Sequence, residues 1–212
     1  MRPSGPPRHR SPDRKSFLRE TVLERRRNCD ATARQAADAA RAARVIDAMA
    51  TWLPGVVAAY ASVDPEPGTE AILTILSGLG TRLLLPVLSG GPAKPGWAWW
   101  KPGDPWRSGA FGIPEPDSPP LEADAIWEAE LFILPGLAGS TEGTRLGVGG
   151  GWYDRALAQA DPGALRWLLL NDDEVMDSLP IDPWDQPVDA IFTETRWINI
   201  ASSKVPDDVP IG

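Results

Sequence analysis

The hydrophobic positions of this chain form short continuous runs that alternate with longer segments of helical spacing. The continuous runs predict buried strands at 56–62, 81–85, 129–134, 166–170 and 188–192. Apolar residues that recur every three or four positions predict helices at about 13–27, 32–52, 69–79 and 152–160. We therefore expect an α/β fold in which helices connect successive strands.

The order of these elements predicts how the strands pair. The succession of strand, helix and strand over 56–85 is a βαβ unit, which favours parallel pairing. A last short strand at 196–200 follows the run at 188–192 after a tight turn and predicts a hairpin. The expectation is a single three-layer domain with a central, largely parallel (mixed) sheet flanked by helices.

The length of 212 residues suits one compact domain, which we assign to residues 13–200. Residues 1–12 are basic, and no apolar stretch follows them, so we expect a disordered extension and not a secretory signal. Residues 201–212 are expected to form a loose tail. No apolar run reaches 18 residues, so we expect neither a transmembrane helix nor a membrane partner.

The segment 88–124 is rich in Pro, Gly and Trp and is too long for a plain connection. We expect it to fold back as short strands and to cover an active site. Two roles suit its tryptophans equally: stacking on a flat heterocycle, or packing in a minor core. The residues concerned are Trp97, Trp99, Trp100 and Trp106.

The chain has one cysteine, Cys29, and one histidine, His9. Within a single chain this excludes a disulfide framework, a zinc cluster and any Ser-His-Asp or Cys-His catalytic unit. A reducing cytoplasm is therefore the expected compartment.

The net charge of −8 is unevenly distributed along the chain. Residues 1–44 contain 12 Lys/Arg and 5 Asp/Glu, whereas the remainder contains 9 and 24. Either this part is a solvated basic helix, or Lys15 and Arg19, which share one helix face, point into an anionic ligand site. It has no aromatic interleaving, so we expect no nucleic-acid partner. The acidic stretch 171–177 is expected to be solvated.

A glycine-rich loop follows the apolar run at 129–134, and a helix is predicted directly after it. Backbone N–H groups of a glycine loop can approach an anion closely, and a helix start adds unpaired N–H groups. Arg145 and Arg155 flank the loop, but it fits neither a Walker loop nor the dinucleotide fingerprint. The pattern alone leaves phosphate binding and a plain tight turn equally open.

The loop resembles the hallmark of the 5-formyltetrahydrofolate cyclo-ligases (methenyltetrahydrofolate synthetases), which reads roughly PG-x-x-x-x-x-x-G-x-RLGRGGGYYDR. Here the stretch from Pro135 to Arg155 matches it, except that Trp152 replaces a tyrosine and Val148 replaces an arginine. Four further stretches are similar to the family and occur in the expected order. They begin at Lys15, Ser62, Phe111 and Val188, so that the resemblance covers about residues 13–195.

The resemblance implies an ATP-dependent C–N ligase that cyclises 5-formyltetrahydrofolate to 5,10-methenyltetrahydrofolate and releases ADP and phosphate. The partners are then ATP and a reduced folate, and we expect a monomer. The implied ATP contacts are Lys15, Arg19, Arg145, Leu146, Gly147, Val148, Gly149, Gly150, Gly151, Trp152 and Tyr153. The implied substrate contacts are Ala61, Glu66, Phe111, Val148, Gly149, Gly150, Gly151 and Trp152.

The same resemblance implies Mg²⁺ as a cofactor, held by Asp154 and Asp189, with Arg145, Tyr153 and Asp154 as the catalytic residues. Magnesium prefers carboxylate, phosphate and water oxygens, which suits these residue types. A plainer role is available for Asp154, which stands where a helix cap or dipole partner would stand. Glu66 likewise suits either substrate binding or an exposed loop.

The clearest departure from the family pattern is Val148, which lacks the charge of the arginine it replaces. Two other functions therefore stay open. A divergent enzyme would use ATP to activate a different amide or carboxylate substrate. A non-catalytic regulator would bind folate or nucleotide without turnover.

Overall fold

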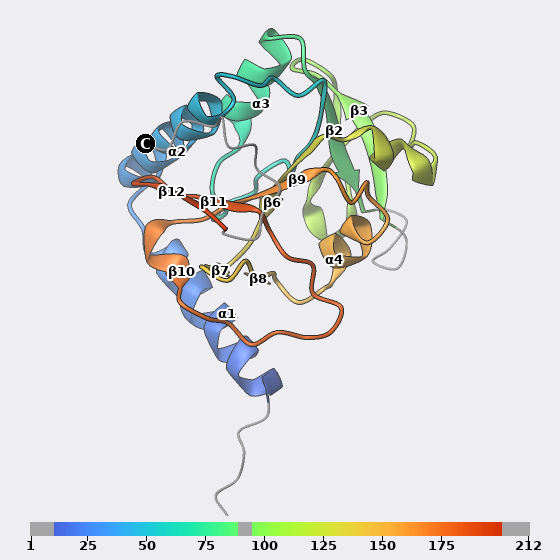
Figure 1. The fold of residues 1–212 in the computed structure, drawn as a ribbon. Coiled ribbons are helices and arrows are strands. Elements are labelled where there is room, and N and C mark those ends of the chain that lie inside the picture. Colours follow the sequence, from blue (N-terminus) through green and yellow to red (C-terminus); the bar gives the residue numbers. More distant parts are fainter. Residues whose placement is uncertain (1–10, 89–94, 201–212) are drawn as a thin grey trace, which may run out of the picture.

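The structure is a computed structural model that describes residues 11–88 and 95–200 (Figure 1). The predicted C-terminal tail, residues 201–212, lies outside the described residues, as does the predicted N-terminal extension, residues 1–12, apart from residues 11 and 12, which begin the first helix. In the described part, no helix is both long enough and apolar enough to cross a membrane.

The described residues form a central seven-stranded sheet in the order β12-β11-β9-β6-β1-β2-β3. Strands β11, β9, β6, β1 and β2 pair in parallel, whereas β12 and β3 join the two edges in antiparallel fashion. The prediction of a largely parallel, mixed sheet is thus confirmed. The strands are β1 Val56–Ala58, β2 Arg82–Val87, β3 Gly96–Trp100, β6 Leu131–Pro135, β9 Leu165–Leu169, β11 Ala190–Phe192 and β12 Trp197–Asn199.

Helices cover both faces of this sheet, which explains why its strands are continuous apolar runs. Helices α2 (Ala31–Ala48) and α3 (Glu70–Gly78) lie on one face, and α4 (Trp152–Leu157) lies on the other (Figure 1). Successive side chains of β6 alternate between the two cores: Ile133 packs with α2 and α3, and Phe132 packs with α4. The three-layer prediction is confirmed.

The βαβ unit predicted over 56–85 is present, because β1, α3 and β2 follow one another and Val57 pairs in parallel with Leu83. The predicted strand 56–62 stops at Ala58, however. Beyond it, side-chain hydrogen bonds replace part of the ladder: the Thr69 hydroxyl donates to the Tyr60 carbonyl at 2.7 Å, and the Ser62 N–H donates to Thr69 Oγ1 at 3.1 Å.

The Pro- and Trp-rich segment forms short elements, as predicted. After edge strand β3 come β4 (Trp106–Ser108), η1 (Ala110–Gly112), β5 (Pro114–Pro116) and η2 (Ala123–Glu128). Its aromatic rings pack against protein: Trp97 contacts Phe132 edge-on, and Trp100 lies against Trp106. In this structure these tryptophans therefore serve packing.

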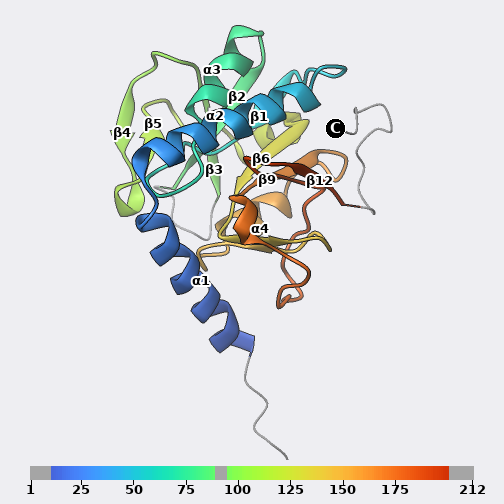
Figure 2. The ribbon, with the colours of Figure 1, turned by 90° about the vertical axis from the view of Figure 1, so that its left-hand side faces the viewer.

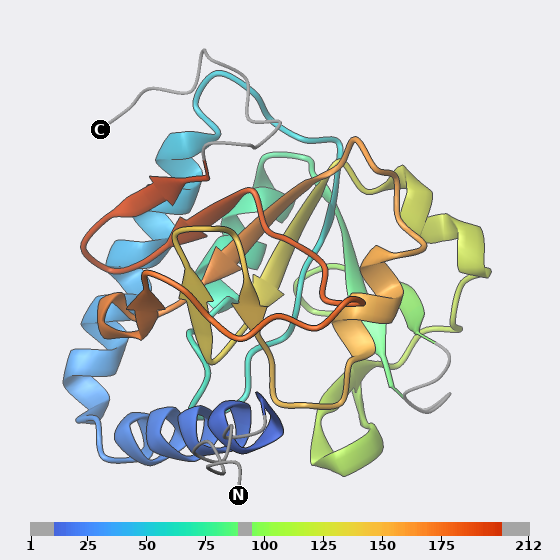
Figure 3. The ribbon, with the colours of Figure 1, turned by 60° about the horizontal axis from the view of Figure 1, so that its bottom comes forward.

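A second, three-stranded sheet in the order β10-β7-β8 lies below the main sheet in the view of Figure 1, beside helix α1 (Ser11–Arg27). The turned views show α1, in blue, at the foot of the domain (Figures 2 and 3). Its strands are β7 Ala138–Ser140, β8 Arg145–Leu146 and β10 Val175–Met176, and the helical turn η3 Asp172–Glu174 precedes β10. The prediction that 171–177 is solvated is wrong for Glu174. Its carboxylate is fully buried and accepts hydrogen bonds from Arg26 of α1.

Candidate active site

A cavity of about 660 Å³, which we call the central cavity, lies where the parallel strands end. Its floor comes from residues at or just after the carboxyl ends of β1, β2 and β6, such as Ala61, Pro86 and Gly136. Open α/β sheets place ligands at this edge, because loops and helix starts gather there. Helix α1, the glycine loop and the segment between β10 and β11 complete its walls.

One face of α1 runs along the central cavity. Lys15, Arg19, Leu23 and Arg26 all line it, at spacings of four, four and three residues. Such spacing places side chains on a single side of a helix. Three cationic side chains therefore follow one wall; that Lys15 and Arg19 bind an anionic ligand there stays a prediction.

The glycine loop, residues 147–151 between β8 and α4, forms another wall of the central cavity and contacts α1. Arg19 Nε donates to the Gly147 carbonyl at 2.9 Å, and a Cβ at Gly149 would lie 3.4 Å from the Arg19 Cζ atom. Gly149 also has a φ of +109°, which disfavours any residue with a side chain. The loop's composition thus allows a guanidinium to lie directly against its backbone.

Arg145 is the buried cation beneath this loop. Its Nη2 donates to Asp154 Oδ1 at 2.8 Å, and its Nη1 donates to the Pro135 carbonyl at 3.3 Å. The guanidinium also lies over the Tyr153 ring, with its Cζ 5.7 Å from the ring centroid. A Cβ at Gly147 would lie 2.8 Å from Arg145 Nη1, so glycine there leaves space for the guanidinium.

Glu66 supplies a carboxylate to the lining of the cavity from the turn that follows β1. Its Oε2 accepts the Val63 N–H at 3.0 Å, which holds the side chain back over its own turn. Burial raises the pKa of the Glu66 carboxyl above its ordinary value, against the opposing effects of that hydrogen bond and the Arg26 charge. Burial also raises the pKa of Tyr153 well above its ordinary value, so this phenol stays protonated near neutral pH.

Lys15 has two carboxylate partners in the segment between β10 and β11. Its Nζ donates to Asp182 Oδ2 at 2.7 Å and to Asp185 Oδ2 at 2.8 Å. Burial by itself lowers the pKa of Lys15, but the hydrogen bonds and negative charges of the two aspartates outweigh it and raise the pKa above its ordinary value. Lys15 therefore remains a cation.

The structure brings most of the predicted site residues to the central cavity. They are Lys15, Arg19, Ala61, Glu66, Arg145, Leu146, Gly147, Val148, Gly149, Gly150, Gly151, Trp152, Tyr153 and Asp154. Phe111 lies in η1, close in sequence to the lining residues Ile113 and Pro114, and its role stays a prediction. Asp189 lies outside the described lining, at the start of β11, where its Oδ2 accepts the Arg166 N–H at 2.9 Å.

Among the described residues, no three His, Cys, Asp or Glu side chains lie close enough to hold a metal ion by themselves. Asp154 nevertheless lines the cavity, and its Oδ1 accepts bonds from Arg145 and the Gln186 N–H. Its Oδ2 has no hydrogen-bond partner in the described part of the chain, which leaves one oxygen for a cation that also binds phosphate.

Sequence reasoning missed several lining residues, including Arg26, Tyr60, Asp182, Trp184 and Asp185. Arg26 continues the helix face begun by Lys15 and Arg19, so its spacing was a usable signal. The segment Asp182–Asp185 has no periodicity, and only the folded chain brings it to Lys15. Three other cations could replace the charge that Val148 lacks. Of these, Arg82 pairs with Glu128, Arg155 donates to the Gly150 carbonyl, and Lys94 lies outside the described residues.

The fold and this cavity together define an α/β protein with a cleft at the carboxyl edge of its sheet, lined by a glycine loop, cations and carboxylates. Comparison with known proteins narrows the class. Residues 11–194 match the sequence profile of the 5-formyltetrahydrofolate cyclo-ligase family, so the chain belongs to that family.

Relatives with established names agree with this assignment. A 5-formyltetrahydrofolate cyclo-ligase of Mycolicibacterium smegmatis is 36% identical over 198 residues, which cover 89% of this chain and 97% of the relative. A cyclo-ligase of Escherichia coli K12 is 29% identical over 156 residues, covering 70% and 85%.

Solved structures agree as well. The 5,10-methenyltetrahydrofolate synthetase of Aquifex aeolicus superposes with a TM-score of 0.72 at 26% identity and covers 91% of this chain and 96% of its own. The Mycoplasma pneumoniae synthetase superposes with a TM-score of 0.66 at 21% identity, covering 85% and 98%, and supports the fold.

Proposed function

We propose that this chain is an ATP-dependent C–N ligase that converts 5-formyltetrahydrofolate to 5,10-methenyltetrahydrofolate, with release of ADP and phosphate. One observation carries the proposal. A single cavity is lined by a glycine loop with three cations, Lys15, Arg19 and Arg145, and by a half-buried carboxylate, Glu66. Polyanionic ATP requires cations, and an N–H-rich pterin ring requires an acceptor such as a carboxylate.

The glycine-loop end suits the phosphates of ATP. The glycines at 149 to 151 have no Cβ that would hold a phosphate away from their backbone N–H groups, and Arg19 has guanidinium donors beyond the Nε bonded to Gly147. Arg145 holds a positive charge under the loop. Such charge-assisted bonds are shorter and stronger than neutral ones, so they suit a triphosphate.

The Glu66 end suits the reduced pterin. An ionised carboxylate accepts two adjacent N–H donors in a two-point contact. Tyr153 also lines the cavity, and the charges of both Arg145 and Glu66 act on it. Because its phenol stays protonated, it can donate a hydrogen bond to an oxygen of either ligand.

The reaction needs placement more than a protein nucleophile. The formyl oxygen takes the terminal phosphoryl group of ATP, and the substrate's own N10 then attacks the activated carbon. N10 loses its proton, and phosphate leaves with the former formyl oxygen. Lys15, Arg19 and Arg145 would orient the phosphates and offset their charge, which is the main protein contribution in phosphoryl transfer.

The residues present fit a magnesium ion shared with the nucleotide. Asp154 would hold it through its unpaired Oδ2, and the ion would neutralise phosphate charge. Asp189, which lies outside the described lining, stays a prediction for this role. The monomeric state and the cytoplasmic location of the enzyme also stay predictions.

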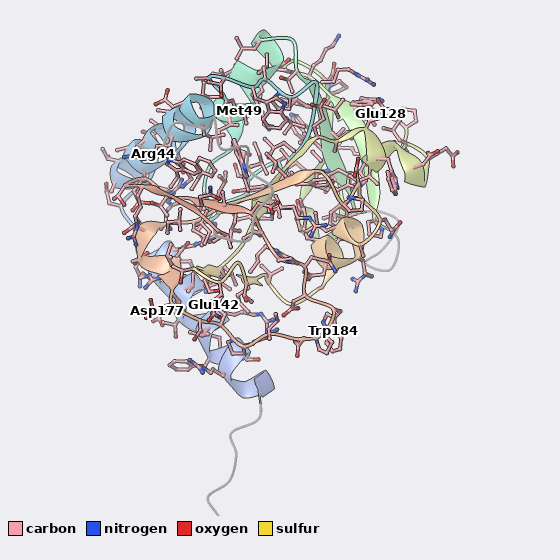
Figure 4. The ribbon with its side chains drawn as sticks, viewed as in Figure 1. Arg44, Met49, Glu128, Glu142, Asp177 and Trp184 are labelled. Carbon is pink, nitrogen blue, oxygen red and sulfur yellow. The ribbon has the colours of Figure 1, made fainter. Side chains whose placement is uncertain are left out.

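The test is to mix protein, Mg-ATP and 5-formyltetrahydrofolate and to follow the near-ultraviolet absorbance of the methenyl product. We expect ATP-dependent product from the unaltered protein and strong loss with Asp154→Ala. Asp177→Asn is a matched control, because this carboxylate is exposed and lies outside the described lining (Figure 4). A folded protein that binds ATP and forms no product would overturn the proposed reaction.

A further inference from the structure

A short turn, Asp182–Asp185, stands at the central cavity without an assigned role. Two hydrogen bonds close it: the Asp185 N–H donates to the Asp182 carbonyl at 3.0 Å, and the Asp182 N–H donates to Asp185 Oδ2 at 2.9 Å. Pro183 within it restricts the backbone, and the next residue, Gln186, donates its N–H to Asp154 at 3.3 Å. The turn is therefore tied to the glycine-loop side of the site.

Both aspartates of this turn bind the same ammonium, that of Lys15, at 2.7 Å and 2.8 Å. An ammonium has three N–H donors, and in the described part of the chain only these two have partners. Lys15 also lines the cavity. One donor is thus left for a ligand oxygen.

The two aspartates differ in exposure. The side chain of Asp185 is 12% exposed, whereas that of Asp182 is 35% exposed. Removing the cation from a buried carboxylate is strongly unfavourable, and Asp185 would also lose its place as acceptor within the turn. Asp182 makes no second side-chain bond among the described residues and can exchange Lys15 for water.

We propose that the two aspartates have opposite roles. Asp185 is a positioning residue that keeps the Lys15 ammonium at the cavity, and Asp182 is an exchangeable partner whose place on Lys15 a nucleotide phosphate oxygen takes. This inference rests on the proposed function, in which Lys15 contacts phosphate. Trp184 lies between the two aspartates, lines the cavity and is 66% exposed at the edge of the molecule (Figure 4). Release of Asp182 therefore changes the surroundings of this indole.

The test compares Asp182→Asn with Asp185→Asn, using calorimetric titration with Mg-ADP so that no turnover is required. Each variant removes one negative charge at nearly the same distance from Lys15, so a purely electrostatic effect would strengthen ADP binding in both. We expect Asp185→Asn to weaken ADP binding about 10- to 100-fold, the range of a charge-assisted hydrogen bond. We expect Asp182→Asn to bind ADP at least as tightly as the unaltered protein.

Equal shifts in the same direction for both variants would overturn the proposal. Weaker ADP binding by Asp182→Asn would by itself overturn the proposal. This test remains decisive if Asp185→Asn does not fold, because Asp182 is the more exposed of the two residues. Asp173→Asn is the matched control. Asp173 pairs with Arg25 of α1, the helix that carries Lys15, and neither Asp173 nor Arg25 belongs to the described lining of the cavity. This variant should leave ADP affinity unchanged.

Two further measurements separate positioning from a merely structural role. In a Lys15→Gln background, Asp185→Asn should weaken ADP binding no further, whereas an additive loss would contradict the proposal. Because Trp152 also lines the cavity, an ADP-induced change in tryptophan emission should decrease in Trp184→Phe, and its full persistence there would refute release of the turn. Failure of the unaltered protein to bind ADP would instead remove the proposed function itself.

Discussion

The ion pair between Arg26 and Glu174 allows a quantitative test of how α1 is held on the domain. The Arg26 side chain is 3% exposed and that of Glu174 is fully buried. Arg26 Nε and Nη2 donate to the two carboxylate oxygens at 2.7 Å and 2.6 Å. Nη2 also donates to the Gly136 carbonyl at 2.7 Å, so the pair joins α1, η3 and the floor of the central cavity.

We expect Glu174→Gln to be strongly destabilising. It leaves a buried guanidinium without its counter-charge, which costs about 3–5 kcal/mol. The carboxylate also accepts the backbone N–H and the side-chain amide of Asn171, both at 2.9 Å. Hydrogen-bond donors thus surround both carboxylate oxygens of Glu174, and the NH2 group of a glutamine would have to face some of these donors. For a domain of this size, the loss corresponds to a decrease in Tm of roughly 6–20 °C.

Urea and thermal unfolding, followed by circular dichroism, measure this effect. Asp173→Asn is again the control, because its pair with Arg25 is solvent-exposed and worth only about 0–1 kcal/mol. A loss for Glu174→Gln no larger than that of the control would refute the reasoning. It would mean that apolar contacts, such as those of the buried Val22, hold α1 without help from the ion pair.

Two other predictions concern ligand binding. Val148 is 71% exposed at the cavity, so Val148→Arg should fit without repacking and should tighten Mg-ATP binding about tenfold in titration; unchanged affinity would show that position 148 does not face phosphate. The raised pKa of Glu66 predicts that folate affinity falls as the pH drops through that pKa, because the protonated carboxyl no longer accepts two N–H donors. Glu66→Gln should remove this pH dependence of KM. The stability effect runs the other way: since the folded state holds the proton more tightly, Glu66 stabilises the fold at low pH and loses this contribution as pH rises through the raised pKa.

The sheet was predictable because its strands are buried on both faces and stand out as apolar runs. The strand ends were less predictable, since Ala59 and Tyr60 are as buried as the strand they follow. Their backbone pairing is partly taken over by the Thr69 side chain, a local bond that apolar periodicity does not encode.

The site was predictable where the motif is contiguous, as in the glycine loop. The site was not predictable where a charged residue pairs with a partner that is distant in the sequence. The acidic stretch 171–177 suggested a solvated loop, yet Glu174 is buried because Arg26 reaches it across 148 positions of sequence. Asp182 and Asp185 were overlooked for the same reason, since their partner, Lys15, is separated from them by most of the chain.

The bonds between α1 and the segment before β11 also determine when the site can exist during synthesis. Lys15 is among the first residues of the domain to leave the ribosome, whereas Asp185 emerges 170 residues later. The strands of the central sheet up to β9 can pair before then, but the part of the cavity that Lys15 and Asp185 line is complete only when the chain is almost finished. An unfinished chain that already contains the glycine loop would therefore lack the aspartates that hold Lys15 at the cavity.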